Sequence, residues 1–457
     1  MITEEKYIEF INEYTSEHPD VYACVVTYGC QQNENDSEKI KQFLSEMGFK
    51  ITQTPDNAGV VIFNTCAVRG GAEERVLGNV GALKHIKEKN PDMIIGILGC
   101  MTQQEQVADH IMKKFRHVDF VMGTRAISKF PEIMYKVISG KERLSVLGDF
   151  DGIYEGVSNY REDKIKASVS VMYGCDNFCS YCIVPYVRGR ERSRRKENII
   201  EEIEKLKDEG VKEITLLGQN VNSYGKGLYD GYDFADLIYD VAKTGINRVR
   251  FMTSHPKDIS ERLICAMAEC ENVCESLHLP FQSGSDRILK AMNRHYTKAE
   301  YLAKIETVKS KIPDIALTSD VIIGFPGETY EDVSETIDLI KKVGFDSLFT
   351  FIFSKREGTA AAKMPDPVSE KDKHKHFEML IAEQNIISRK INESYLGNTY
   401  EVLVEGASKT NENMLTGRTR TNKIVNFSPV NARPGDLVNL KITSVKTWSL
   451  FGEEKER

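Results

Sequence analysis

The sequence contains no apolar run that approaches the roughly 18 residues of a membrane-spanning helix. Its first twenty residues are too acidic for a signal peptide, which needs a positively charged start and an apolar core. The acidic side chains are Glu4, Glu5, Glu9, Glu13, Glu17 and Asp20. We therefore expect a cytoplasmic protein that has no membrane partner.

The chain also lacks the secretory signal that usually accompanies a disulfide framework, although it has ten cysteines. We expect reduced thiols that act as ligands or reactive groups instead. With 457 residues, 41% of them hydrophobic, the sequence is long enough for about two to four domains with sizeable cores. The net charge of −7 conceals a basic run at residues 188–196, so a nucleic-acid partner is not excluded.

Three cysteines lie in one short loop with the spacing C-x3-C-x2-C: Cys175, Cys179 and Cys182. The loop follows an alternating apolar run at residues 167–172, which places three thiolates at the end of a predicted strand. Three soft donors from one loop suit a four-iron cube and leave the fourth iron open to a non-protein ligand. The loop is therefore a candidate iron–sulfur site with an open position.

A structural zinc site is the alternative for this loop. Such sites usually draw four Cys or His ligands from paired C-x2-4-C units. No fourth Cys or His lies within the loop, although His255 or His278 could supply one from elsewhere in the chain.

The first third of the sequence alternates apolar runs with amphipathic segments, which predicts a parallel α/β sheet. The predicted strands are residues 22–28, 60–64, 94–98 and 120–122, and the predicted helices are residues 36–47, 72–89 and 105–115.

Each of the first three predicted strands leads directly into a cysteine, namely Cys30, Cys66 and Cys100. Parallel strands share one carboxyl edge, where open α/β sheets bind their ligands, so the three thiolates should converge there. Glycines before two of them, Gly29 and Gly99, would let the backbone approach a bulky group. A second three-cysteine cluster is the inference, and small buried residues that end core strands are the alternative.

Residues 151–164 are polar and lack apolar periodicity, which predicts a linker between a first domain at residues 1–150 and a second at residues 165–396. The second domain has six strand-like runs separated by helical patterns, which predicts a partial (β/α)6 barrel. The runs are residues 167–173, 213–217, 248–253, 277–281, 316–323 and 347–353. Short polar motifs follow these runs, and ligands in such barrels gather at the carboxyl ends of the strands.

After a long predicted helix at residues 370–392, the pattern changes to short strands with turns, which predicts a small β-barrel at residues 397–457. The predicted strands are residues 399–404, 424–427 and 437–444. The segment 417–423 is basic and rich in hydroxyl groups, which suits contact with RNA phosphates. A solvated hairpin is the alternative for this segment.

The spacing of the central loop, with Tyr181 before its last cysteine, resembles the signature of the radical S-adenosylmethionine (SAM) superfamily. Other motifs resemble the methylthiotransferase family, in particular its MiaB branch, over almost the whole chain. These motifs are residues 28–33, 64–69, 99–103, 182–189, 218–225 and 292–297, together with a terminal barrel that is similar to a TRAM domain.

The resemblance implies two [4Fe-4S] clusters and SAM as cofactors. Cys175, Cys179 and Cys182 would hold the SAM-cleaving cluster, while Cys30, Cys66 and Cys100 would hold an auxiliary cluster in the first domain, which carries the sulfur to be inserted. The positions of Gln219, Asn220, Ser283 and Asp320 correspond to SAM contacts in such barrels. The four other cysteines, Cys24, Cys265, Cys270 and Cys274, are expected to be buried for packing and are assigned no metal.

The resemblance also implies a function in tRNA modification. Such an enzyme converts N6-dimethylallyladenosine next to the anticodon to its 2-methylthio derivative, using one SAM as methyl donor and a second as radical source. Carbon-2 of adenine carries a C–H bond that ordinary acid–base or nucleophilic catalysis does not activate, so a radical is required. The implied partners are the anticodon stem-loop of tRNA, an electron donor and a sulfur source.

The expected RNA contacts are basic residues after the central loop and in the terminal barrel. They are Arg188, Arg190, Arg192, Arg194, Arg418, Arg420 and Lys423, and the alternative for them is a solvated surface or pairing with carboxylates of the same protein. Two other functions remain open at this point: methylthiolation of a ribosomal-protein aspartate, and a non-enzymatic iron–sulfur protein that binds RNA.

Overall fold

The computed structural model describes residues 4–18, 21–67, 71–140, 142–148, 160–409 and 411–454. The chain divides into two compact units, each described by itself below. Unit 1 consists of Met1–Glu162, Tyr173–Asp176 and Cys182–Arg194, and unit 2 of Asp163–Met172, Asn177–Tyr181 and Arg195–Arg457. Most of the predicted linker, residues 151–159, lies outside the described residues. None of the helices described is long and apolar enough to cross a membrane.

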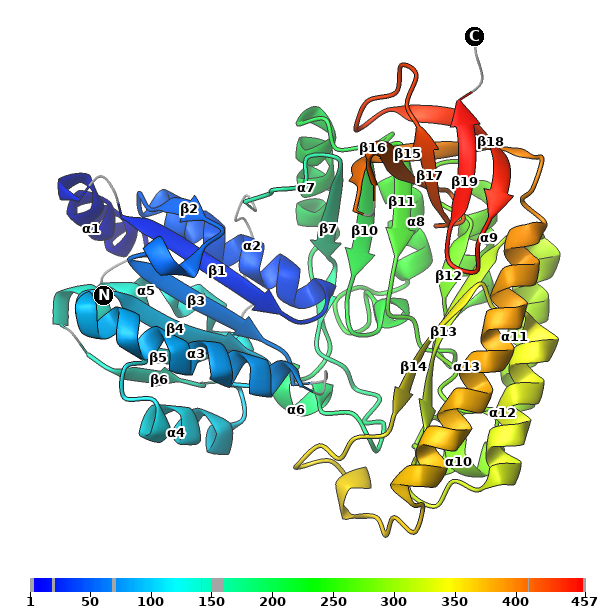
Figure 1. The fold of residues 1–457 in the computed structure, drawn as a ribbon, viewed down its shortest axis with the longest axis horizontal. Helices are drawn as coiled ribbons and strands as arrows, with labels where there is room; N and C mark the ends of the chain where they lie inside the picture. Colours follow the sequence, from blue (N-terminus) through cyan, green and yellow to red (C-terminus); the bar gives the residue numbers. More distant parts are fainter. Residues whose placement is uncertain are drawn as a thin grey trace. The chain divides into compact units, whose positions relative to one another are not determined.

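Unit 1 contains a six-stranded sheet with the strand order β2-β1-β3-β4-β5-β6, in which all neighbours are parallel (Figure 1). The strands are β1 (Tyr22–Tyr28), β2 (Lys50–Thr52), β3 (Val60–Thr65), β4 (Ile94–Gly99), β5 (Phe120–Gly123) and β6 (Leu144–Val146). The predicted parallel α/β sheet is confirmed. The sequence pattern does not predict the edge strands β2 and β6, which have three residues each and no fully buried side chain.

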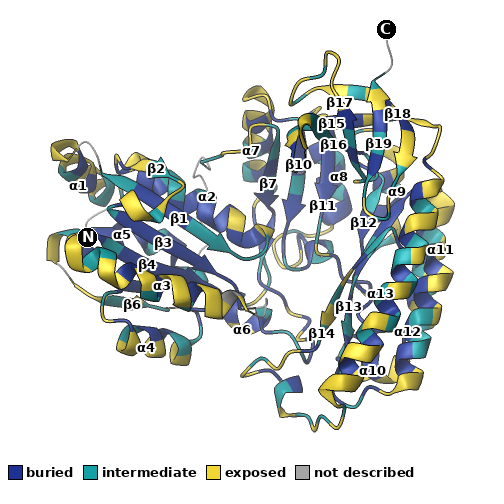
Figure 2. Cartoon of the chain, in the orientation of Figure 1, coloured by how far each residue is buried: buried dark blue, intermediate teal, exposed yellow. Residues whose placement is uncertain are grey.

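Helices cover both faces of this sheet. One face is covered by α1 (Glu4–Glu17), α2 (Gln31–Glu46) and α5 (Phe130–Gly140), and the other by α3 (Ala72–Lys89) and α4 (Glu105–Lys114). Neighbouring residues of a strand point to opposite faces, so Ile62 packs with the first group and Phe63 with the second. Figure 2 shows the consequence, since the central strands are buried while the outer surfaces of the helices are exposed. The short helix α6 (Val184–Arg188) also belongs to unit 1.

Unit 2 contains six parallel strands that follow the chain order in two three-stranded sheets, β7-β10-β11 and β12-β13-β14 (Figure 1). A parallel bridge between Val249 and Val273 continues the pairing from the first sheet toward the second. The strands are β7 (Lys166–Ser170), β10 (Glu213–Leu217), β11 (Arg248–Phe251), β12 (Ser276–His278), β13 (Ala316–Ile323) and β14 (Ser347–Ile352). All six predicted strands are present, and the partial (β/α)6 barrel is confirmed.

The helices of this barrel pack their apolar faces on the outside of the strands in one continuous core. They are α7 (Lys196–Asp208), α8 (Phe234–Lys243), α9 (Glu261–Glu269), α10 (Asp286–Ala291), α11 (Lys298–Lys311), α12 (Tyr330–Val343) and α13 (Glu370–Glu393). Ile199, Ile203 and Leu206 of α7 are buried, as their helical spacing predicts. The short strands β8 (Met172–Tyr173) and β9 (Arg192–Ser193) flank the cysteine loop in the sequence.

The end of unit 2 is a closed five-stranded barrel with the strand order β15-β16-β17-β19-β18. The strands are β15 (Thr399–Ser408), β16 (Asn411–Thr419), β17 (Ile424–Ser428), β18 (Leu437–Val445) and β19 (Leu450–Glu454). The predicted terminal β-barrel is confirmed, but its sequence pattern indicates only three of these strands. β16 is mostly polar and half-exposed, and it is held by pairing with β15 and β17, so residues 417–419 belong to a strand and not to a loop.

Candidate functional site

The cysteines of the first triplet lie at one edge of the sheet in unit 1. Cys30 follows β1 by one residue beyond Gly29, Cys66 directly follows β3, and Cys100 directly follows β4. These three strands are adjacent and parallel, with Tyr28 paired to Thr65 and Thr65 paired to Gly99. Cys66 and Cys100 are buried, and Cys30 is half-buried at the N-terminus of α2.

The asparagines of the two N-terminal motifs hold this edge together. Asn33 accepts a hydrogen bond from the Cys30 thiol at 3.3 Å and donates to Asn64 Oδ1 at 2.9 Å. Asn64 in turn donates to the backbone oxygen of Asn33 at 2.8 Å. Both amides are fully buried, so these bonds tie the start of α2 to the end of β3 and fix the position of Cys30.

The glycines before two of these cysteines serve a purpose that differs from the sequence interpretation. Gly99 has φ +119°, and a Cβ atom there would lie 2.3 Å from the backbone oxygen of Thr65. A Cβ atom on Gly29 would lie 2.6 Å from the Asn33 side chain. Close packing against neighbouring protein atoms therefore requires both glycines, without any bulky ligand.

A buried ion pair stands beside this triplet. Arg188 Nη2 lies 2.8 Å from Asp36 Oδ2, and the two side chains are only 6% and 2% exposed. Burial disfavours the charged form of Arg188, but the charges of Asp36, Cys100 and Cys30 outweigh it and raise its pKa. The structure thus places Arg188 in an internal ion pair, the alternative that the sequence left open, and its contact with RNA stays a prediction.

Burial and the charge of Arg188 also shift the pKa of a thiol in the first triplet. Burial raises the pKa of Cys100 to about 12, the charge of Arg188 partly offsets that increase, and Cys66 and Cys30 add to it. The register of β1, β3 and β4 places these three cysteines at neighbouring strand ends. Two buried thiols and a half-buried one, with one nearby cation, form a soft donor set that suits iron, whose positive charge would stabilise the thiolates.

Across the described residues, no group of three or more His, Cys, Asp or Glu side chains is arranged around a single metal-ion position. In a four-iron cube each thiolate binds a different iron atom, so its sulfur atoms stand farther apart than around a single zinc ion. A cube held by Cys30, Cys66 and Cys100 therefore does not require a group arranged around a single metal ion.

The loop of the second triplet depends on a glycine. Gly174 has φ +78°, and a Cβ atom there would lie 1.9 Å from the backbone oxygen of Arg190. The Cys175 amide donates to the Gly189 oxygen at 3.1 Å, which folds the loop back on the segment that follows it. Cys175 and Cys182 belong to unit 1, and Cys179 belongs to unit 2.

Arg294 is a site residue that the sequence reasoning missed. It is buried in unit 2, where its Nη1 lies 3.4 Å from Cys179 Sγ and its Nη2 donates to the Pro280 oxygen at 2.6 Å. Asn293 donates to the Phe178 oxygen at 3.0 Å. Both residues lie in the family motif at residues 292–297, which was the signal available in the sequence.

The predicted SAM contacts follow the strands of the barrel in unit 2. Asn220 is buried after β10 and donates to Ser223 Oγ at 2.5 Å and to Asp258 Oδ2 at 2.8 Å. Ser283 is buried, and Asp320 is half-buried on β13 with Oδ1 at 3.6 Å from His278 Nε2. Gln219, next to Asn220, is half-buried. Their role as SAM contacts remains a prediction.

Several buried polar atoms in the segments after β10, β11, β12 and β13 have no hydrogen-bond partner in the described part of the chain. They are Asn220 Oδ1, Asn222 Oδ1, Ser254 Oγ, His255 Nε2, Gln282 Oε1 and Glu328 Oε1. Such orphaned groups are rare inside a protein unless a ligand satisfies them. A zwitterion with ribose hydroxyls and an adenine, such as SAM, offers donors and acceptors to match them.

Strained backbone conformations occur in the segments after β11 and β12 as well. Non-glycine residues in the left-handed region include Thr253 (φ 70°) after β11 and Gln282 (φ 67°) after β12. Phe178, Asn293 and His295 in the segments around Cys179 and Arg294 share this conformation. Strain of this kind concentrates at ligand sites, where the surrounding structure holds it in place.

Two titratable groups at this end of the barrel are held neutral. Burial, with the charges of Arg294 and Lys257, lowers the pKa of His255 to about 2. Burial raises the pKa of Glu328 to about 8, although the Gly324 amide donates to it at 2.5 Å. A neutral imidazole and a protonated carboxyl can each donate one hydrogen bond and accept another.

The other predicted RNA contacts near the cysteine loop differ in exposure. Arg190 is 71% exposed and lies 3.1 Å from Asp176 Oδ1. Arg192 is half-buried on β9, and Arg194 is buried. Of these residues only Arg190 offers a largely exposed guanidinium.

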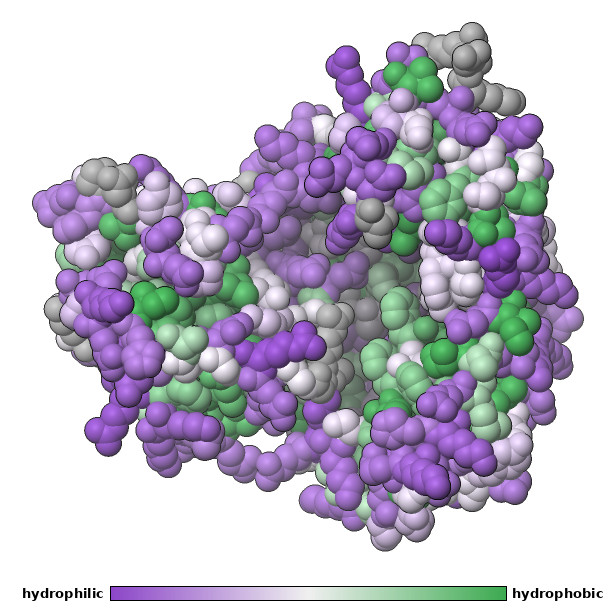
Figure 3. All heavy atoms as spheres, in the orientation of Figure 1, coloured by the Kyte–Doolittle hydropathy of each residue, from purple (hydrophilic) through white to green (hydrophobic). Residues whose placement is uncertain are grey.

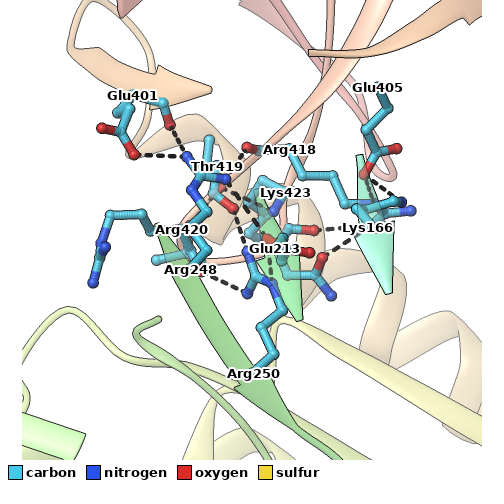
Figure 4. Close-up of polar contacts among 12 residues, drawn as sticks. Lys166, Glu213, Arg248, Arg250, Glu401, Glu405, Arg418, Thr419, Arg420 and Lys423 are labelled. Atoms are coloured by element: carbon cyan, nitrogen blue, oxygen red, sulfur yellow. Dashed lines mark hydrogen bonds and ion pairs between the residues drawn. The ribbon is translucent and has the colours of Figure 1, made fainter. Parts of the chain in front are cut away.

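Each of the three basic residues predicted to contact RNA from the terminal barrel forms an ion pair within unit 2, and Figure 4 shows Arg418 with its partner Glu405. The pairs are Arg418 with Glu405 at 3.2 Å, Arg420 with Glu275 at 2.7 Å, and Lys423 with Asp346 at 2.7 Å. The alternative left open by the sequence, pairing with carboxylates of the same protein, is what the structure shows for these side chains.

Two buried arginines of β11 also bind the turn of the terminal barrel, through the backbone oxygens of that turn. Arg248 donates to the Arg418 oxygen at 2.8 Å, and Arg250 donates to the oxygens of Arg420 and Thr419 at 2.8 and 2.9 Å. Figure 4 shows these side chains reaching from the strands of the larger barrel to the backbone of β16 and its turn. The turn between β16 and β17 is therefore anchored on the larger barrel.

Three segments of the chain match family models. Residues 22–123 match "Uncharacterized protein family UPF0004", residues 169–340 match the "Radical SAM superfamily", and residues 393–454 match the "TRAM domain".

The chain is similar over nearly its whole length to curated proteins named tRNA-2-methylthio-N(6)-dimethylallyladenosine synthase. The protein from Acetivibrio thermocellus is 53% identical over 99% of this chain and 94% of its own length. The protein from Alkaliphilus oremlandii is 53% identical over 94% of this chain and 92% of its own length.

Among solved structures, the radical S-adenosylmethionine methyltransferase TsrM from Kitasatospora setae, with cobalamin and a [4Fe-4S] cluster bound, has a TM-score of 0.54. The match covers 75% of this chain and 77% of that one at 13% identity. At this identity the likeness shows the fold alone.

Replacing Arg188 by Ala should lower the free energy of unfolding by about 3–5 kcal/mol, because it leaves the Asp36 carboxylate buried without its partner. Urea unfolding would measure the change. Arg190→Ala is the matched control, since its exposed pair should contribute at most about 1 kcal/mol. The double variant Arg188→Met with Asp36→Leu should recover part of the loss. Equal effects of the two single alanine variants would contradict the ion-pair interpretation.

Replacing Glu328 by Gln should remove a pH dependence of stability. The pKa of Glu328 is about 8 in the folded protein, above its unfolded value of about 4.3, so wild-type stability falls as pH rises through this window. The variant should gain up to about 4 kcal/mol relative to wild type by pH 8 and little at pH 4.

Unfolding by urea at several pH values, without added SAM, would measure the difference. The exposed neighbour Glu331, replaced by Gln, is the control and should show no such gain. A difference between Glu328→Gln and wild type that stays constant from pH 4 to pH 8 would contradict the shifted pKa.

Proposed function

The chain belongs to the tRNA-2-methylthio-N(6)-dimethylallyladenosine synthase family, and on that premise we propose that it converts N6-dimethylallyladenosine next to the anticodon of tRNA to its 2-methylthio derivative. The observation that carries the proposal is the presence of two cysteine triplets, together with unsatisfied polar atoms at the carboxyl ends of the barrel strands. One triplet follows three parallel strands of unit 1, and the other lies in the loop after β7 and β8. The names of the relatives favour tRNA over a ribosomal protein as substrate.

Cys175, Cys179 and Cys182 would hold one [4Fe-4S] cluster, and Cys30, Cys66 and Cys100 a second. Together with SAM these groups would supply a carbon radical, the sulfur atom and the methyl group, which side chains alone cannot provide. An electron donor and a sulfur source complete the set of proposed partners.

The protein's own residues would bind and orient these groups. The amide, hydroxyl and imidazole groups of Asn220, Ser254 and His255 provide hydrogen bonds for a polar ligand at the carboxyl ends of β10 and β11. Because His255 stays neutral, it adds no repulsion toward a sulfonium cation.

Arg188 and Arg294 would act on the clusters from the protein side. Arg188 is directed at the first triplet and is held there by Asp36, so its charge favours the ionised thiols. Arg294 donates toward Cys179 of the second triplet. Fixed cations and hydrogen bonds beside ligand sulfur atoms tune the potential of an iron–sulfur cluster.

The proposal is tested by the nucleosides of tRNA from a strain that lacks this protein. Mass spectrometry should find N6-dimethylallyladenosine and no 2-methylthio derivative, and expression of the wild-type protein should restore the derivative. Methylthio product that persists in the deletion strain, or a methylthiolated ribosomal protein that disappears from it, would count against the proposed substrate.

The two triplets should have separable roles in the purified protein. Wild type reconstituted without oxygen should hold about eight irons, and Ala replacements of either whole triplet should leave about four. Removal of Cys30, Cys66 and Cys100 should preserve cleavage of SAM and abolish sulfur insertion, because the radical is generated at the other triplet.

The matched control is the pair Cys265→Ala and Cys270→Ala, which removes two half-buried cysteines outside both triplets and should leave the iron content unchanged. Iron at the wild-type level in the Cys175, Cys179 and Cys182 variant, or zinc in place of iron, would contradict the assignment of the central loop.

A further inference from the structure

The basic turn of the terminal barrel is engaged inside unit 2, which raises the question of which surface of this barrel meets RNA. Arg418, Arg420 and Lys423 pair with carboxylates, and the backbone of the turn accepts hydrogen bonds from Arg248 and Arg250. A turn held in this way offers few free donors to a phosphate. The neighbouring hairpin, between β18 and β19, has its turn at the same end of the barrel, because β17 and β19 are parallel. In the described part of the chain, the side chains of Lys446 and Trp448 in this hairpin form no ion pair or hydrogen bond.

This hairpin carries the one tryptophan of the chain. Trp448 is 55% exposed in the turn between the two strands. Covering so large a ring with a partner would be favourable, because apolar area would leave water. Tryptophan is also enriched at interfaces, where its ring is covered and its N–H finds a hydrogen-bond partner.

The turn itself is rigid. The Lys446 amide donates to the Ser449 oxygen at 2.7 Å and closes the turn. Asn392 at the end of α13, which is 2% exposed, donates to the oxygens of Lys446 and Thr447 at 2.8 and 2.9 Å. The ring of Trp448 is therefore presented on a fixed backbone, which lowers the entropy lost when a partner binds.

The surface beside Trp448 is aromatic and basic. Lys446 Nζ lies 5.1 Å from the centre of the Phe451 ring, and no carboxylate among the described residues pairs with it. Phe451 is half-buried on β19, in register with Asn426 of β17 and Ser444 of β18. Lys441 is exposed on β18, in register with Glu453. Figure 3 shows hydrophobic side chains among the hydrophilic surface of this barrel.

We propose that Trp448, Phe451 and Lys446 form a stacking surface for an unpaired base of the tRNA substrate. Every base has a flat face that stacks on an aromatic ring, and a neighbouring ammonium favours the adjoining phosphate. In five-stranded barrels of the oligonucleotide-binding kind, the loop between the fourth and fifth strands is one of those that contact nucleic acid, and the Trp448 turn is that loop here. This inference rests on the proposed function and assigns a surface to its substrate.

Intrinsic fluorescence can test this inference, because all tryptophan fluorescence of the protein comes from Trp448. Titration of the reconstituted wild-type protein with the anticodon stem-loop RNA should quench this emission and protect it from acrylamide. The affinity obtained from the emission should agree with that obtained from the anisotropy of a labelled RNA. Emission that stays unchanged while the RNA binds would overturn the inference.

Variants give a second and independent measurement. Trp448→Ala should raise the dissociation constant for the RNA about 5- to 150-fold, because stacking of one base is lost. Trp448→Phe keeps a stacking ring and should stay within about threefold of wild type. Val430→Ala, which removes an exposed apolar side chain elsewhere on the same barrel, is the control and should leave the affinity unchanged.

The outcomes separate this inference from the proposed function. If Trp448→Ala binds the RNA as tightly as wild type while wild type still forms the methylthio product, the stacking surface is wrong and the function stands. If wild type neither binds the RNA nor modifies it, the proposed function itself fails.

Discussion

The parallel pairing of adjacent strands is the constraint on which the first candidate cluster site and the ligand end of the larger barrel depend. In a parallel sheet the carboxyl ends of neighbouring strands meet at one edge, so residues that follow separate strands become neighbours in space. The register that pairs Tyr28 with Thr65 and Thr65 with Gly99 places the residues after them together. A shift of the register would separate Cys30, Cys66 and Cys100, whatever the rest of the unit did.

Buried charged side chains are the second feature that determines the geometry of this protein. Removing a guanidinium and a carboxylate from water costs several kcal/mol, which only a close and well-bonded pair can offset. Such a pair therefore fixes geometry more than it adds stability. Arg188 and Asp36 fix a positive charge beside the first triplet, while Arg248 and Arg250 fix the turn of the terminal barrel on the larger barrel.

The amino and carboxyl ends of the strands in the larger barrel differ in how their polar groups are paired. At the amino end of β10 and β11, Glu213, Arg248 and Arg250 form ion pairs within the protein, and one atom of each has no hydrogen-bond partner among the described residues. At the carboxyl ends, buried polar atoms are unsatisfied and the backbone is strained. The amino end therefore contributes mainly to stability, and the carboxyl end has the features of a ligand site, as in other barrels of parallel strands.

The sequence by itself determined the elements whose signal is local. Apolar runs located the main strands of both units, and helical spacing located α7, α12 and α13. The positions of Cys30, Cys66 and Cys100 after strands indicated the first triplet, and the C-x3-C-x2-C spacing indicated the second. These features depend on the period of the side chains, which each segment carries alone. Polar strands such as β16 carry no such period and form only because their neighbours offer hydrogen bonds.

Only the tertiary structure decided which charges pair and which aromatic rings stay in solvent. Arg188 and Asp36 are 152 residues apart, and Arg250 and Arg420 are 170 residues apart. A basic residue in the sequence can therefore mean a phosphate contact or an internal ion pair, and no local pattern separates the two. Trp448 is likewise a ring that could fill a core, and only the folded structure shows it exposed, in a turn whose backbone Asn392 of α13 binds.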